Sequence, residues 1–187
     1  GCIIGDFNDL NVLVRGEEAF VIDADSFQFG PYLARMFTTR FVDPTKLDPK
    51  NSSLTLAKPY NEHSDWYAYA VMLMQTLLFV GPYGGVYRPK DPAERMPHDL
   101  RPLRRITVFH PEVLYPKPAV HFRVLPDDIL QYFHRVFERD ERGIFPRLFL
   151  ESLEWRACAC GTVHARPVCP VCNVPGLIKE TIRVKGK

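Results

Sequence analysis

The sequence of 187 residues lacks several features that would assign it to a particular class of protein. No apolar stretch is long enough to cross a membrane, and the longest, residues 67–80, contains Gln75 and Thr76 and is better explained as a buried helix. No signal peptide is visible. The net charge of +2 is too small to indicate nucleic-acid binding by electrostatics alone. These absences predict a cytoplasmic globular protein without a membrane partner.

Cysteine is nearly absent outside one short region. Four of the five cysteines lie between Cys158 and Cys172, and Cys2 stands alone, where we expect a small buried hydrophobic residue. Clustered cysteines in an otherwise cysteine-poor chain are typical of a metal site in a reducing compartment, not of a disulfide framework.

The cysteine spacing points to zinc. Cys158 and Cys160 are followed by Gly161, and the second pair, Cys169 and Cys172, forms a Cys-Pro-x-Cys turn. Four thiolates suit a closed, tetrahedral, structural Zn²⁺ site. A module of about thirty residues has little core of its own, so the metal would supply much of its folding energy. An iron–sulfur cluster, unligated thiols and replacement of one ligand by His164 remain as alternatives.

Periodicity predicts an α+β fold that is mainly helical. Residues 31–64 and the proline-rich residues 86–126 have few regular signals and predict long irregular connections. The expected helices span 65–79, 127–138 and 145–153, and the expected strands span 12–14, 19–22 and 177–184. We expect a larger domain over residues 1–155 and a small zinc ribbon over 156–187.

Acidic and amide side chains flank the predicted β-hairpin. Asp6 and Asn11 precede its first strand and Asp23 follows its second. Antiparallel strands bring these two ends together, so the three side chains could face one site. Their oxygens suit Mg²⁺, and a carboxylate beside the ion could accept a proton from a hydroxyl nucleophile. The bland alternative is that these residues only form turns and caps.

The two acidic segments also resemble a known family. Residues 5–14 read Gly-Asp-Phe-Asn-Asp-Leu-Asn-Val-Leu-Val, and residues 21–28 read Val-Ile-Asp-Ala-Asp-Ser-Phe-Gln. They resemble the catalytic loop and the metal-binding Asp of bacterial eukaryotic-like Ser/Thr protein kinases. The resemblance implies that Asp6 is the catalytic base and that Asn11 and Asp23 hold Mg²⁺ beside ATP. It makes Asp25 a weaker candidate for the metal.

Further along, the chain resembles the C-terminal lobe of these kinases to about residue 153, with departures. The resemblance implies that Asp65, at the start of the central helix, accepts hydrogen bonds from the catalytic-loop backbone. Asn8 replaces a common lysine, and Thr45 replaces the glutamate that usually pairs with an arginine late in the lobe. Arg142 matches that arginine, and we hypothesise that Asp43 is its partner.

The expected function is Mg²⁺- and ATP-dependent phosphoryl transfer to protein Ser or Thr, as part of a longer kinase. No glycine-rich phosphate loop occurs in the sequence, so the N-terminal lobe is expected to be missing from this chain. A catalytically inactive scaffold that binds a protein partner is one alternative, and a small-molecule phosphotransferase is another.

The C-terminal end is basic, which makes a nucleic-acid partner a weakly supported expectation, because a solvated basic tail is the commoner explanation. Its cationic residues are Arg156, Arg166, Lys179, Arg183, Lys185 and Lys187, and an acidic protein is the other partner that they could attract.

Overall fold

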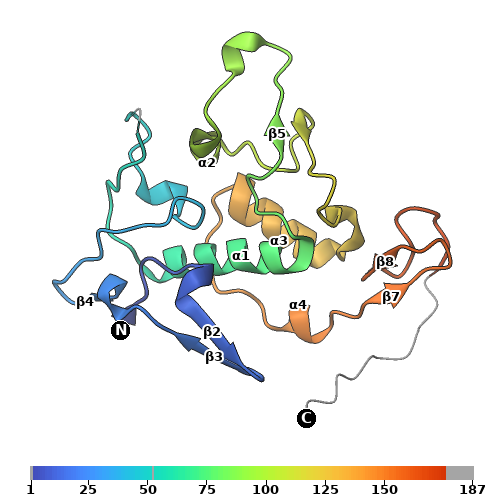
Figure 1. The fold of residues 1–187 in the computed structure, drawn as a ribbon, viewed down its shortest axis with the longest axis horizontal. Coiled ribbons are helices and arrows are strands. Elements are labelled where there is room, and N and C mark those ends of the chain that lie inside the picture. Colours follow the sequence, from blue (N-terminus) through green and yellow to red (C-terminus); the bar gives the residue numbers. More distant parts are fainter. Residues whose placement is uncertain (1, 52, 176–187) are drawn as a thin grey trace.

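The computed structural model describes residues 2–51 and 53–175 and shows a mixed α and β fold with few helices (Figure 1). The helices are α1 (Glu62–Leu78), α2 (Arg101–Arg104), α3 (Asp127–Glu138) and α4 (Leu148–Glu151). Short antiparallel pairs join β1 (Cys2–Ile3) to β4 (Gln28–Phe29), β2 (Val12–Arg15) to β3 (Glu18–Val21), β5 (Val86–Tyr87) to β6 (Val113–Leu114), and β7 (Arg156–Ala157) to β8 (Val163–His164). Helices α1 and α3 supply most of the core, and residues of the irregular connections complete it.

The core lies between α1 and α3, which run across the centre of the molecule (Figure 1). The predicted bounds of α3 are confirmed, and its apolar face packs on α1, with the rings of Tyr67 and Phe137 5.7 Å apart. Helix α1 begins three residues earlier than predicted. The reason is a capping box, in which the Asn61 side chain accepts from the Ser64 N–H (3.1 Å) and the Asn61 N–H donates to the Ser64 hydroxyl (2.8 Å).

The structure departs from one prediction of secondary structure and agrees with another. The helix expected over 145–153 is wrong in length, since α4 covers only Leu148–Glu151. Pro146 disfavours the helical conformation of Phe145, which instead packs its ring against Tyr132, 4.9 Å away. The irregular course of residues 86–126 is confirmed, apart from the short helix α2, short turns and short strands. The strand expected over 177–184 lies outside the described residues.

A buried ion pair fastens the loop at residue 43 to the core. Arg142 donates from Nε to Asp43 Oδ2 (2.9 Å) and from Nη2 to Asp43 Oδ1 (2.8 Å), and its guanidinium lies 4.6 Å from the centre of the Tyr67 ring. Burial alone would raise the pKa of Asp43, but the hydrogen bonds and charge of Arg142 outweigh it and lower that pKa. The contact hypothesised between Asp43 and Arg142 is thus confirmed.

The cysteine-containing segment is joined to the helical part by specific hydrogen bonds. The Ala165 N–H donates to the Val124 carbonyl (2.8 Å), and Arg166 donates to the Leu125 carbonyl (2.8 Å) and to Asp127 at the start of α3. The segment lies beside the end of the core, at the right of Figure 1. In the described part of the chain, every helix is too short or too polar to traverse a bilayer.

Candidate functional site

The loop that carries Asp6 is held by two short strand pairs. Register Val12↔Val21 closes the β2–β3 hairpin, whose predicted strands are confirmed, and the Ile22 N–H donates to the Asn11 carbonyl (2.9 Å). On the other side, β1 pairs with β4 through Ile3↔Gln28. The segments around Asp6 and Asp23 are therefore brought side by side, as the sequence predicted.

The side chain of Ser26 and a close backbone approach at Gly5 hold these segments together. The Ser26 hydroxyl lies 3.1 Å from the Asp23 carbonyl and 3.4 Å from the Ile4 carbonyl, so it can donate to either. Gly5 has a φ of +78°, and a Cβ there would lie 2.5 Å from the Ser26 carbonyl oxygen. Only glycine permits both this conformation and this close approach.

Asp65, at the first turn of α1, braces the same loop. Its two carboxylate oxygens accept from the backbone N–H groups of Ile4 (2.8 Å) and Gly5 (3.0 Å). Burial raises the pKa of Asp65 in spite of these two hydrogen bonds, which act in the opposite direction. The predicted contact between Asp65 and the loop backbone is confirmed, and it fixes the residues immediately before Asp6.

Asp6 itself contacts a threonine that is distant in sequence. Its Oδ1 accepts from the Thr38 N–H (2.7 Å) and its Oδ2 accepts from the Thr38 hydroxyl (3.1 Å). Asn8 is buried and donates both to the Asp6 carbonyl (2.9 Å) and to the Thr38 hydroxyl (3.3 Å), while Asn11 donates to the Asp6 carbonyl (3.2 Å). Asp6 thus sits in a polar network that presents its carboxylate to a hydroxyl group.

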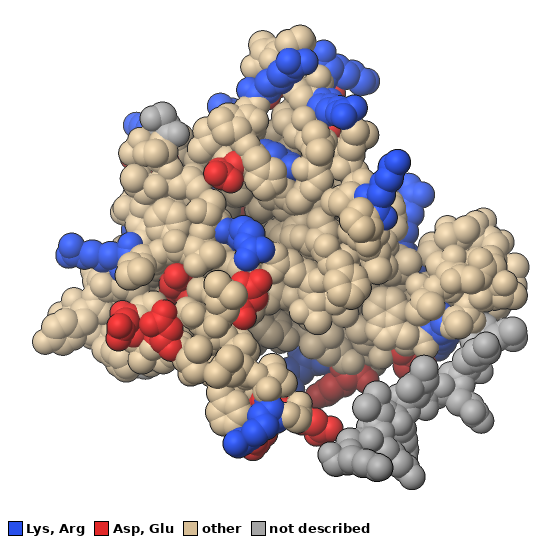
Figure 2. Space-filling model, viewed as in Figure 1, with Lys and Arg blue, Asp and Glu red and all other residues tan. Residues whose placement is uncertain are grey.

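Asp23 and Asp25 lie at the surface on the neighbouring turn. Asp23 adopts a left-handed conformation (φ 64°, ψ 59°), which aspartate tolerates better than most residues. Figure 2 shows acidic side chains gathered on this part of the face. Among residues 2–51 and 53–175, however, Asp6, Asp23 and Asp25 do not form a compact group of three metal-binding oxygens. The Mg²⁺ assignment therefore stays a prediction.

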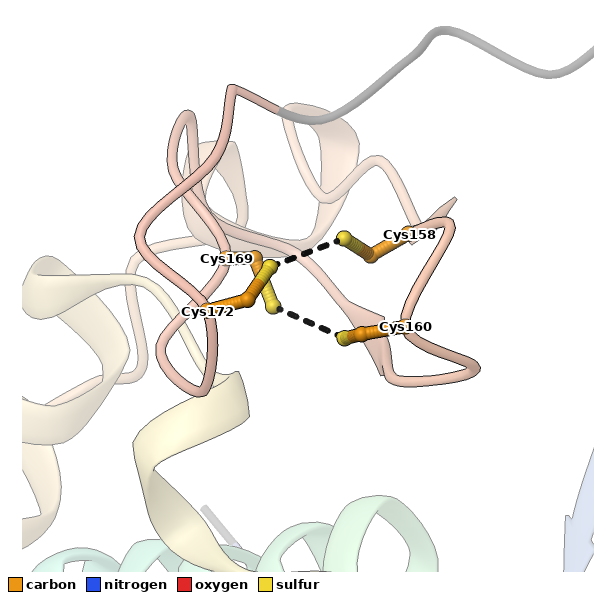
Figure 3. A group of neighbouring side chains, drawn as sticks. All are labelled: Cys158, Cys160, Cys169 and Cys172. Atoms are coloured by element: carbon orange, nitrogen blue, oxygen red, sulfur yellow. Dashed lines mark hydrogen bonds between the residues drawn. The ribbon is translucent and has the colours of Figure 1, made fainter.

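The four cysteines, by contrast, do converge (Figure 3). Their Sγ atoms all lie within 4.8 Å of one another, with 3.4 Å between Cys158 and Cys172 and 3.7 Å between Cys160 and Cys169. A tetrahedral Zn²⁺ with bonds of about 2.3 Å places its sulfurs about 3.8 Å apart. The described geometry is therefore compatible with a structural zinc site held by these four residues.

Local hydrogen bonds shape the two cysteine turns. The Gly161 N–H donates to the Cys158 carbonyl (2.9 Å) and the Asn173 N–H donates to the Cys169 carbonyl (3.0 Å). Gly161 has a φ of +87° and Asn173 a φ of +58°, conformations that glycine and asparagine accept most readily. Gly161 and Asn173, which are adjacent to the cysteines, therefore shape the turns that direct the four thiols toward one another.

The remaining expectations about this region have mixed outcomes. His164 is buried outside the four-thiol group, and its Nδ1 accepts from the Arg166 N–H (3.2 Å). Cys2 is exposed, so the expectation that it is buried is wrong, because β1 lies at the surface. Arg156 contacts Glu154 (3.0 Å) and Arg166 contacts Asp127, while Lys179, Arg183, Lys185 and Lys187 lie outside the described residues.

Comparison with known proteins finds no matching family model, no matching curated protein and no matching solved structure. The function is therefore inferred from the residues and their geometry.

Sequence reasoning missed the pairing of Asp6 with Thr38 and the bridging role of Ser26. These contacts join residues 32 and 22 positions apart. Neither has a spacing signal of the kind that marks a cysteine pair.

Proposed function

We propose that this chain provides the acceptor-binding part of an enzyme that transfers the γ-phosphoryl group of ATP to Ser or Thr hydroxyls of proteins. The resemblance of the sequence to the C-terminal lobe of bacterial eukaryotic-like kinases supports this function. One observation carries it: the Asp6 carboxylate accepts a hydrogen bond from a threonine hydroxyl at 3.1 Å. This is the contact that a general base makes with a hydroxyl nucleophile before accepting its proton.

The surrounding contacts favour a positioning role for the loop. Phosphoryl transfer depends mainly on placement and charge stabilisation, so a base must be held rigidly. Asp65 holds the backbone before Asp6, and Asn11 holds the Asp6 carbonyl through its Nδ2. The Oδ1 of Asn11 and the carboxylate of Asp23 are the atoms that would hold Mg²⁺, which would neutralise charge on the phosphates.

A protein-binding scaffold without catalysis is the second candidate. It is favoured by the engagement of both Asp6 oxygens by Thr38. In a scaffold, the same contacts would only stabilise the loop.

An assay of phosphate transfer by the protein produced from its native gene distinguishes the two candidate functions. With Mg²⁺ and radiolabelled ATP, we expect Asp6→Asn and Asp23→Asn each to lower turnover by about 10²–10⁴-fold, as loss of a general base or metal ligand does. Glu17→Gln, an exposed carboxylate in the hairpin turn, is the matched control and should leave turnover unchanged. Undiminished transfer in Asp6→Asn refutes the enzyme assignment, and absence of transfer in the unmutated protein favours the scaffold.

A further inference from the structure

A hollow of about 380 Å³ lies on the loop that joins β5 to α2. Its lining consists of Tyr87, Arg88, Pro89, Arg95 and Met96. The volume falls within the range of about 300–1,000 Å³ that is typical of ligand pockets. This loop stands at the top of Figure 1, well apart from the β2–β3 hairpin and from β7–β8, and Figure 2 shows Lys and Arg side chains gathered over it. Both charged residues that line the hollow are cationic, so its charge favours an anionic ligand.

The two arginines of the hollow have no partner in the described part of the chain. Arg88 and Arg95 are exposed, and their guanidinium groups make no ion pair or hydrogen bond there, whereas the guanidinium of Arg105 pairs with Asp140 at 2.6 Å. A guanidinium presents a planar fork of N–H donors that matches two oxygens of a phosphate or carboxylate. Arg88 and Arg95 border the same hollow, so both forks are available to one ligand.

The loop is held in shape without the use of these guanidinium groups. The Arg88 N–H donates to the Glu112 carbonyl (2.8 Å), and the Lys90 N–H donates to the Glu112 carboxylate (3.0 Å). The Tyr87 ring packs edge-on against His110, with 5.7 Å between the ring centres. A preformed site lowers the ordering cost of binding, and here that order does not depend on the arginine side chains.

Carboxylates near the loop are absent from the described lining of the hollow. Asp91 accepts from the Ala93 N–H (2.8 Å), and Glu112 is engaged by the backbone as described above. Glu94 is exposed and acts on Tyr87, since desolvation and, after it, the charge of Glu94 raise the pKa of Tyr87. Glu94 is therefore a negative charge that opposes an anion in the hollow, and its removal should favour binding.

The charge of the hollow selects among anions. A phosphate monoester on a side chain carries about −1.5 to −2 at neutral pH, which matches two guanidinium groups better than the single charge of a carboxylate. A nucleic acid carries its charge along a repeating backbone and is bound by an extended basic stripe. Here the two arginines are confined to one hollow. Tyr87 and Met96 provide apolar surface beside them for the carbon atoms that carry the phosphate.

We propose that this hollow, the Arg88–Arg95 hollow, binds the phosphate of a phosphoserine or phosphothreonine side chain in a protein partner. Arg88 and Arg95 hold the phosphate oxygens, and Tyr87 and Met96 contact the neighbouring carbon atoms. The choice of these two phosphorylated residues rests on the proposed function, whose products contain them. The binding of a phosphate monoester rests on the hollow alone and needs no phosphate transfer.

The test is peptide binding by this chain, measured by fluorescence anisotropy with a degenerate peptide library that has phosphoserine fixed at its centre. We expect this library to bind about tenfold or more tightly than the same library with serine, and Arg88→Gln and Arg95→Gln each to raise its Kd about tenfold. The melting temperature should not change, because both side chains are exposed. Arg104→Gln, an exposed arginine outside the hollow, is the matched control and should change the Kd less than about twofold.

Two further variants separate specific recognition from general attraction between charges. Arg88→Lys keeps the positive charge but loses the planar fork, so it should still weaken binding of the phosphoserine library. Glu94→Gln should strengthen binding, because it removes the opposing charge.

The outcomes distinguish the ligands. Equal affinity for the two libraries overturns the site, as does equal weakening by Arg104→Gln and Arg88→Gln, which indicates diffuse attraction. Inorganic phosphate that competes as well as the phosphopeptides, or single-stranded RNA that binds more tightly through the same arginines, overturns the peptide ligand. Phosphopeptide binding without phosphate transfer leaves the site standing and favours the scaffold, whereas transfer without a preference for phosphopeptides leaves the enzyme standing and refutes the site.

Discussion

The two candidate sites differ in how the chain assembles them. The cysteine site is formed by residues 158–172, and its turns are shaped by their own neighbours, Gly161 and Asn173. The Asp6 site depends on Thr38 and on Asp65. Asp65 accepts hydrogen bonds from backbone N–H groups that lie 60 and 61 positions before it in the sequence. Spacing in the sequence is therefore a strong guide to the first site and a weak guide to the second.

The two sites also differ in what stabilises them. A small module with few buried residues depends on metal binding for its fold. The Asp6 loop instead depends on a helix that is already secured by the α1–α3 core. Perturbations of metal, core and loop should therefore have separable effects, which decrease in that order.

Metal removal should have the largest effect. We expect one Zn²⁺ per chain in the purified protein, and Cys169→Ser, which alters a fully buried ligand, should abolish stoichiometric binding. Binding of structural Zn²⁺ contributes about 10–16 kcal/mol in small zinc modules, so the fold around the four cysteines should be lost with it. Elemental analysis and amide exchange of residues 156–175 provide the measurements.

Cys2→Ser is the control for that experiment, because Cys2 is an exposed cysteine outside the four-thiol group. It should keep the full metal content. Equal zinc content in Cys169→Ser and the unmutated protein would contradict the four-thiolate assignment.

Breaking the Asp43–Arg142 pair should have the next largest effect. Arg142→Met leaves a buried carboxylate without its partner and should lower the free energy of unfolding by about 3–5 kcal/mol. Urea denaturation measures this change, and a double-mutant cycle with Asp43→Asn should show coupling. Arg147→Met removes half of an exposed pair with Glu151 and should cost less than about 1 kcal/mol.

The same pair predicts a dependence on pH. Arg142 lowers the pKa of Asp43 below its ordinary value of 3.8, against the opposing effect of burial. The stabilisation is therefore complete above pH 3.8 and disappears as the pH falls through the lower, folded-state pKa. Unfolding measured between pH 6 and pH 2 should show a smaller loss of stability in Asp43→Asn than in the unmutated protein.

Asp65→Asn should have the smallest effect on stability and a local effect on the loop. Asparagine keeps one acceptor oxygen and loses the other, but it also removes a negative charge whose burial is unfavourable and raises the pKa of Asp65. We expect a net loss of about 1 kcal/mol, with faster hydrogen exchange at the Ile4 and Gly5 amides. Glu62→Gln removes a charge from the same helical turn and should leave both amides unchanged; equal acceleration in the two variants would contradict the bracing role.

Much of the helical core was predictable because periodicity reports burial directly. The bounds of α3 agree with prediction, and the buried character of α1 follows from its apolar residues. The start of α1 was missed because it depends on the reciprocal bonds between Asn61 and Ser64. The start of α4 was missed because the apolar pattern begins at Phe145, where the following Pro146 disfavours the helical conformation.

The sequence by itself determined the hairpin, the central helices and the group of four cysteines, since each depends on neighbours within a short stretch of chain. Only the tertiary structure decided that Thr38 occupies both oxygens of Asp6 and that Phe79 stands at a cavity. These features require segments that are distant in the sequence to pack against each other, and no local pattern of residues encodes that contact.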